Sequence, residues 1–164
     1  MKNNNILTDR QLSSLNSIAH NDKFHKALIK INKDYSNFEN FITSFEKYVN
    51  KKLLSIKKNK YPFDDKLFDS IITRLEILDK HKKIALRIYL ESQKKNRYFL
   101  VLTKSIHEYF SHQFNSSPQA GIAIVTYALA FNIWIEDDKD LDKTMSFLGK
   151  TIDYIKKIEP FLKK

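Results

Sequence analysis

The chain has 164 residues, of which 42% are hydrophobic, and its formal net charge at pH 7 is +10. That length suffices for one well-buried domain, and the apolar content is too high for a disordered chain. The sequence contains no cysteine, which excludes disulfides, thiolate metal sites and a cysteine nucleophile. With two glycines and three prolines, it has few residues for hairpins or glycine-rich phosphate loops, so we predict an all-α fold.

The positive charge is concentrated near the N-terminus. Residues 1–60 hold 12 Lys and Arg against 5 Asp and Glu, whereas residues 61–164 hold 17 against 14. Such an asymmetry indicates either a polyanionic partner or a lysine-rich solvated surface, and composition leaves both open. The opening segment MKNNNILTDR has neither the apolar core of a signal peptide nor the Arg-rich character of a transit peptide. We therefore expect a cytoplasmic protein.

Capping signals and apolar spacing predict about eight helices. The segments TDRQ (8–11) and SNFE (36–39) fit the capping box, in which the cap and the side chain three residues later accept from each other's backbone N–H. Ser117 precedes a proline at a first helical position, and Asp140 is placed to cap the last helix. In chain order, the predicted helices span 8–20, 22–33, 36–58, 64–79, 80–93, 96–113, 118–136 and 140–162.

The clearest interruption is the segment 59–65, because Pro62 prevents a continuous helix there. We therefore predict a short helical N-terminal module over 1–60 and a second helical domain over 61–164.

The basic face of the N-terminal module is a candidate DNA-binding surface. Lys23, Lys26, Lys30 and Lys33 recur at helical spacing and are followed by Tyr35. Such a face can follow a row of DNA phosphates. The same pattern is typical of a solvated amphipathic helix, so the sequence leaves both interpretations open.

The segment 120–135 is apolar nearly all round. Its sixteen residues would reach about 24 Å as a helix, less than a hydrocarbon core of about 30 Å, so we expect no transmembrane segment. The next helix has a heptad-like apolar seam, and together the two helices carry more apolar surface than one neighbour covers. We therefore predict a homodimer, with an entirely intramolecular core as the alternative. The predicted interface consists of Ile133, Trp134, Leu141, Met145, Leu148, Ile152 and Ile155.

No constellation of catalytic residues stands out, and the five histidines lack metal-site spacing. We expect no enzymatic activity, no cofactor and no metal site. The acidic residues of 136–142 are more typical of helix capping than of a calcium loop. Polar groups near the apolar helix are candidates to line a small-molecule pocket, although for any one of them a role in a packed core is the favoured alternative. The predicted pocket residues are His107, Tyr109, Thr126, Tyr127 and Phe131.

Two stretches carry a family resemblance: DKLFDSIITRLEILDKHKKIAL (65–86) and YALAFNIWIEDDKDLDKTMSFLGKTID (127–153). They resemble the ligand-binding and dimerisation region of TetR-type regulators, in particular an alphaproteobacterial branch. The C-terminal region is also similar to the lipid-binding accessory proteins of coenzyme Q biosynthesis. The likeness covers roughly residues 64–160. The matching residues are Leu67, Phe68, Asp69, Arg74, Trp134, Asp137, Asp138, Asp140, Thr144, Met145 and Leu148.

The resemblance implies a helix-turn-helix DNA-binding module followed by a helical domain that binds a small hydrophobic ligand and dimerises through its last two helices. This makes a transcriptional regulator the expected function. The alternative is a protein of ubiquinone biosynthesis that binds an isoprenoid lipid and not DNA. Residues 1–60 contain no glycine for the tight turn of a helix-turn-helix, and 24–38 resembles a reduced recognition unit. The coenzyme Q branch usually carries an Asp-rich aromatic motif where this chain reads HQFNSSPQAG.

Overall fold

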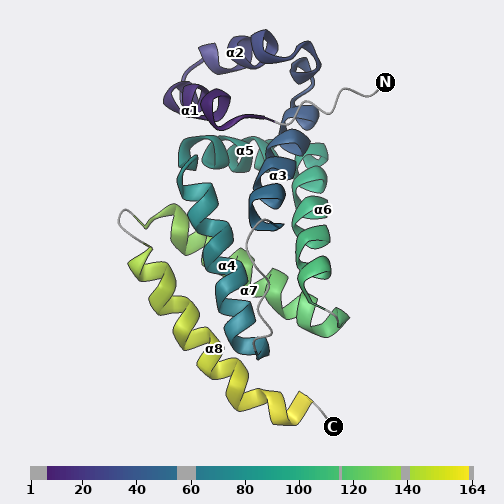
Figure 1. Ribbon diagram of the computed structural model, residues 1–164, viewed down its shortest axis with the longest axis vertical. Helices are drawn as coiled ribbons and strands as arrows, with labels where there is room; N and C mark the ends of the chain where they lie inside the picture. The colour runs from purple at the N-terminus through teal and green to yellow at the C-terminus, as the bar shows by residue number, and fades with distance from the viewer. Residues whose placement is uncertain (1–6, 55–61, 115, 138–140, 163–164) are drawn as a thin grey trace. The chain divides into compact units, whose positions relative to one another are not determined.

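The computed structural model describes residues 7–54, 62–114, 116–137 and 141–162 (Figure 1). Every regular element in these ranges is a helix, which confirms the predicted all-α fold of about eight helices. The helices are α1 (Asp9–Ile18), α2 (Lys23–Ile31), the 3-10 turn η1 (Lys33–Ser36), α3 (Phe38–Leu54), α4 (Phe63–Asp79), α5 (Lys82–Lys94), α6 (Asn96–Gln113), α7 (Ser117–Ile135) and α8 (Asp142–Leu162).

The first predicted capping box is present. The Gln11 backbone N–H donates to Thr8 Oγ1 at 3.3 Å, and the Thr8 N–H donates to Gln11 Oε1 at 2.9 Å. α3 starts two residues later than predicted, because Ser36 belongs to η1. The side chain of Asn37 instead accepts from the Glu39 N–H at 3.1 Å. α7 is capped by Ser116, one residue before the predicted cap, and the cap predicted at Asp140 lies outside the described residues.

The helices pack into two compact units that alternate along the chain. Unit 1 comprises Met1–Ile56 and Ile77–Ile106, and unit 2 comprises Lys57–Glu76 and His107–Lys164. α4 and α6 therefore each contribute residues to both units. The predicted division at residue 60 assigned 77–106 to the C-terminal part, whereas packing groups these residues with the N-terminal helices.

The core of unit 1 is an aromatic cluster around Phe41, which is fully buried. The rings of Phe24, Tyr35 and Phe38 lie 5.6–5.7 Å from the Phe41 ring, and that of Phe45 lies at 6.3 Å. Such ring pairs add stabilisation beyond the area that they bury. A hydrogen bond of 3.2 Å from the Ile84 N–H to Asn16 Oδ1 also ties the start of α5 to α1.

The core of unit 2 contains a row of aromatic rings that runs from Phe63 to Trp134. Successive rings in this row are separated by 5.2–6.5 Å. Its members are Phe63, Phe114, Phe110, Tyr127, Phe131 and Trp134. α7 packs against α8 beside this row, and both Trp134 and Leu148 are fully buried.

Among the described helices, α7 alone is long and apolar enough to cross a membrane by length and composition. A third of its most apolar window is buried, and the core helix of a soluble protein passes the same test. The expectation that the chain has no transmembrane segment therefore stays a prediction.

Candidate functional site

The two units differ sharply in charge. Unit 1 holds 17 Lys and Arg against 7 Asp and Glu, whereas unit 2 holds 12 of each. The formal net charge of +10 therefore resides entirely in unit 1. The difference in net charge between the two units is larger than that between residues 1–60 and 61–164. The reason is that the segment 77–106 adds 8 basic residues and only 2 acidic ones to the N-terminal helices. A field of this sign attracts polyanions.

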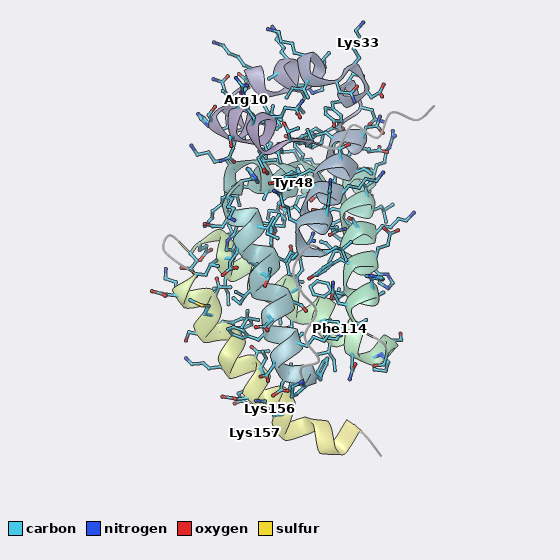
Figure 2. All side chains as sticks on the ribbon, viewed as in Figure 1. Arg10, Lys33, Tyr48, Phe114, Lys156 and Lys157 are labelled. Atoms are coloured by element: carbon cyan, nitrogen blue, oxygen red, sulfur yellow. The ribbon has the colours of Figure 1, made fainter. Side chains whose placement is uncertain are left out.

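The predicted basic face lies on α2 and the turn that follows it. Lys23, Lys26, Lys30 and Lys33 are all exposed, while Phe24 and Leu28 of the same helix are buried in unit 1. Figure 2 shows Lys33 extending away from the helices. α2 follows α1 after four intervening residues, 19–22, which is the linker length of a helix-turn-helix.

Tyr35, the fifth predicted DNA-contacting residue, is placed differently from the lysines. It retains only 2% of its exposure, and its ring packs edge-on against Phe41 at 5.6 Å. The side chain therefore belongs to the core of unit 1, and we leave it out of the basic face.

A polar cluster in unit 1 was not predicted from the sequence. The Tyr48 hydroxyl donates to Asp9 Oδ1 and lies 3.2 Å from His81 Nε2, and Lys52 Nζ lies 3.0 Å from Asp9 Oδ2 (Figure 2 labels Tyr48). It joins the first turn of α1 to α3 and to the residue that precedes α5. These residues lie far apart in the sequence, so no local motif could reveal the cluster.

The cluster indicates which ring nitrogen of neutral His81 carries the proton. Because the Tyr48 proton goes to Asp9, His81 Nε2 must be the donor toward Tyr48, which leaves Nδ1 unprotonated in the neutral ring. Nδ1 is buried and has no hydrogen-bond partner among the described residues. Burial lowers the pKa of His81, although the nearby Asp9 carboxylate opposes this shift. The hydrogen bonds from Tyr48 and Lys52 lower the pKa of Asp9.

The predicted pocket residues are only partly brought together. Tyr109 and Tyr127 are buried on either side of Arg74, whose guanidinium carbon lies 5.3 Å and 5.4 Å from the two ring centroids. The Tyr109 hydroxyl donates to the Ser70 carbonyl at 3.4 Å, and burial raises the pKa of Tyr109 to about 12. Phe131 is half-buried, with its ring 5.9 Å from that of Tyr127.

The other two predicted pocket residues do not join the rings in the same way. Thr126 is buried on α7. His107 is exposed on α6, where its Nδ1 lies 3.4 Å from Ser111 Oγ. Arg74, which is fully buried, was noticed in the sequence only as part of the family resemblance, because α4 carries other charged residues and nothing local marks this one as buried.

The turn between α7 and α8 uses one of its acidic residues as a structural anchor. Both the backbone N–H and the hydroxyl of Thr144 donate to Asp137 Oδ2 at 2.8 Å, and both residues are buried. Leu141, just before α8, has a φ of 61°, a conformation that a branched side chain rarely adopts. For Asp137, the structure thus supports the capping interpretation over cation binding.

The outer face of α7 is apolar and exposed. Val125 retains 61% and Leu129 49% of their exposure, and Gly121, Ala128 and Asn132 are exposed on the same side. The predicted interface residues lie mainly elsewhere. Trp134, Leu141, Leu148 and Ile152 are buried within the chain, and Ile133, Met145 and Ile155 are half-buried. Because α7 is apolar all round, its sequence could not reveal which side packs inward.

Comparisons with known proteins add no family to this description. No protein-family model matches the chain, and neither the search of curated proteins nor that of solved structures finds a match. The resemblance to TetR-type regulators and to coenzyme Q accessory proteins therefore stays a prediction. Across the described residues, no group of three or more His, Asp or Glu side chains is arranged to hold a metal ion.

Proposed function

We propose that the protein is a TetR-like homodimeric regulator, in which unit 1 binds double-stranded DNA and unit 2 dimerises and takes up a small hydrophobic ligand. The observation that carries this proposal is the division of charge. All of the excess positive charge lies in unit 1, whereas unit 2 is neutral and keeps an apolar helix face exposed. A polyanion is attracted to the first surface, and a second copy of the chain can cover the second.

Within unit 1, α2 is the element we assign to the DNA. Its exposed lysines point to one side, and the buried Phe24 and Leu28 hold the helix on the unit from the other side. A dimer would present eight such lysines, because each subunit contributes Lys23, Lys26, Lys30 and Lys33. Contacts between lysines and phosphates release counterions, so the affinity should depend steeply on salt.

Within unit 2, the exposed side of α7 is the surface we assign to the partner subunit. We assign the apolar ligand to the region of the rings from Phe63 to Trp134, where the buried Arg74, 5.3 Å and 5.4 Å from the Tyr109 and Tyr127 ring centroids, would be the polar group. Mostly apolar linings with a few polar groups are typical of small-molecule sites.

Fluorescence anisotropy with a labelled DNA duplex tests the DNA-binding part. Between 50 and 200 mM salt, eight phosphate contacts predict an affinity loss of about 10³–10⁵-fold. The variant Lys23→Gln/Lys26→Gln/Lys30→Gln should bind weakly and with a smaller salt slope. The matched control Lys143→Gln/Lys150→Gln/Lys157→Gln removes three exposed lysines from unit 2 and should bind as the wild type does. Absence of wild-type binding at 50 mM salt, or equal losses in both variants, would contradict the proposal.

One observation favours a second candidate function, a lipid-binding accessory protein of ubiquinone biosynthesis that does not bind DNA. The segment 24–38, which resembles a reduced recognition unit, forms α2 and the four-residue turn η1, with no further helix before α3. Lipid extraction of the purified protein followed by mass spectrometry tests this candidate. A stoichiometric isoprenoid, together with no DNA binding at low salt, would favour it over the regulator.

A further inference from the structure

The imidazole of His81 is buried in unit 1 on a fixed stretch of backbone. The side chain belongs to a residue that retains 5% of its exposure, and its ring packs edge-on against that of Tyr48, with the centroids 5.5 Å apart. The His81 N–H donates to the Leu78 carbonyl at 2.9 Å, and the His81 carbonyl accepts from the Ile84 N–H at 3.0 Å. The backbone is therefore held in the connection between α4 and α5, and the ring is covered by side chains of neighbouring helices.

His81 is the one group of this cluster that changes its charge between pH 7.5 and 5.5. The charged groups that act on its ring are Asp9 of α1, Lys52 of α3 and Lys80 of the connection. The pKa of the Asp9 carboxyl is lowered by the hydrogen bonds that it accepts from Tyr48 and Lys52, so it stays ionised, and both lysines stay cationic. Burial raises the pKa of Tyr48, so its hydroxyl stays neutral.

A proton taken up by the buried ring goes to Nδ1, which has no hydrogen-bond partner among the described residues. A buried N–H without an acceptor costs free energy, and the new positive charge adds to that cost. The Asp9 carboxylate favours the charge, whereas burial and the two lysines oppose it. Burial is the largest of these effects, so protonation favours any state in which the His81 ring reaches water.

Of the helices joined by the cluster, α1 is held most weakly. It buries two of its ten residues, whereas α3 buries eight of its seventeen. Two polar ties join α1 to the rest of unit 1. The Tyr48 hydroxyl donates to Asp9, and the Ile84 N–H donates to Asn16 Oδ1 at 3.2 Å. Elements with few buried contacts open first, so α1 is the helix that can uncover the ring while the aromatic core stays packed.

We propose that His81 is a pH-sensitive switch for α1: when its ring takes up a proton, α1 separates locally from α3 and α5 while the rest of the core stays folded. In the open state, the ring regains the ordinary histidine pKa of about 6.5. Between pH 7.5 and 5.5, the equilibrium should therefore shift toward the open state by up to about tenfold. Because α2 follows α1 after four residues, the same step loosens the helix assigned to DNA, a consequence that rests on the proposed function.

Native-state hydrogen exchange on the full chain, without DNA, tests the proposal. After correction for the intrinsic exchange rate at each pH, the amides of Leu12 and Leu15 in α1 should lose up to about tenfold of their protection between pH 7.5 and 5.5. They should exchange faster than the amide of Phe41 in the core of α3. Low concentrations of urea should change their exchange little, because a local opening exposes little surface.

A pair of variants isolates the histidine. His81→Gln places a neutral amide in the cluster at every pH and should abolish the pH dependence of α1 protection, and His81→Asn serves the same purpose if the first variant does not fold. The matched control His20→Gln removes an exposed histidine that lies just after α1 and should keep the wild-type change.

Three outcomes would overturn the proposal. The first is equal protection of the α1 amides at the two pH values in the wild type. The second is exchange of these amides with the same rate and urea dependence as that of Phe41, which would mean that α1 opens only when the whole chain unfolds. The third is an unchanged pH dependence in His81→Gln. Failure of the protein to bind DNA would alter none of these measurements, because α1 opening is measured on the free protein.

Discussion

Units 1 and 2 are built alike inside and differ at their surfaces. Each is helical and has a core of closely spaced aromatic rings, around Phe41 in unit 1 and along the row from Phe63 to Trp134 in unit 2. Unit 1 carries the whole net charge, whereas unit 2 is neutral and exposes the apolar side of α7. The internal packing accounts for the fold, so the differences that bear on function lie in what each unit exposes.

The largest expected effects come from the two aromatic cores. Phe41→Ala and Trp134→Ala should each lower the free energy of unfolding by about 3–5 kcal/mol, because each leaves a large cavity in a buried cluster. Since α4 and α6 contribute to both units, we expect each variant to unfold in one transition in urea. Separate transitions, one moved by each substitution, would instead mean that the units unfold independently. Val125→Ala, at an exposed position, should stay within about 0.5 kcal/mol of the wild type.

The next largest effect concerns the exposed side of α7. Val125→Glu/Leu129→Glu should weaken self-association by at least about 100-fold, because it places like charges on an apolar contact between two copies. Sedimentation equilibrium measures this change. The control Ser13→Glu/Ser14→Glu adds the same charge to exposed positions of α1 and should leave the association constant unchanged. If the wild type stays monomeric at high micromolar concentration, the exposed side of α7 is not a surface for self-association.

A smaller effect is expected at the helix caps, where the two units can be compared directly. Thr8→Ala removes a reciprocal capping box in unit 1 and should cost about 1 kcal/mol. Ser116→Ala removes a single capping bond of 3.3 Å in unit 2 and should cost less. Chemical denaturation measures both, with the exposed Thr43→Ala as the neutral reference. A larger loss for Ser116→Ala would reverse the expected order.

The smallest effect is a pH dependence between pH 7.5 and 5.5 that we expect from His81 of unit 1. Burial lowers the pKa of His81 in the folded chain, so the unfolded chain takes up a proton more readily. Neutral, buried His81 therefore contributes its full stability above the ordinary histidine pKa of about 6.5. That contribution is lost as the pH falls through this value. Urea denaturation at pH 7.5 and 5.5 should therefore show a drop that His81→Gln reduces and that the exposed control His20→Gln does not. The lowered pKa of Asp9 adds a further loss only at more acidic pH. In unit 2, the described histidines 107 and 112 are exposed.

Local features of the sequence predicted the helices well. Proline at 62, the capping box at Thr8 and the three-and-four spacing of apolar residues all act within a few residues, so they can be recognised without the fold. The 3-10 turn at Lys33–Ser36 was missed, because Lys33 and Ser36 were assigned to the two flanking helices and residues 34–35 to the gap between them. The sequence did not reveal which side of α7 is buried and which is exposed, because apolar residues lie on every side of this helix.

Contacts between distant segments could not be predicted. The cluster of Asp9, Tyr48 and His81 joins positions separated by more than thirty residues, and Arg74 lies between tyrosines from two other helices. Burial of Tyr35 likewise follows from its packing on Phe41 and not from its neighbours in the chain. Helix positions follow from local sequence, whereas functional groupings depend on packing that a single sequence does not reveal.

The interleaving of the two units has a consequence for dividing the gene. A cut after codon 60 would separate the N-terminal helices from 77–106, which complete their compact unit, and would leave the remaining fragment with a segment that has lost its neighbours. Neither product would be a self-sufficient domain. Exchange of unit 1 for the matching part of another protein would require three coordinated joins, one after residue 56, one within α4 and one within α6, so recombination should rarely exchange one unit without the other.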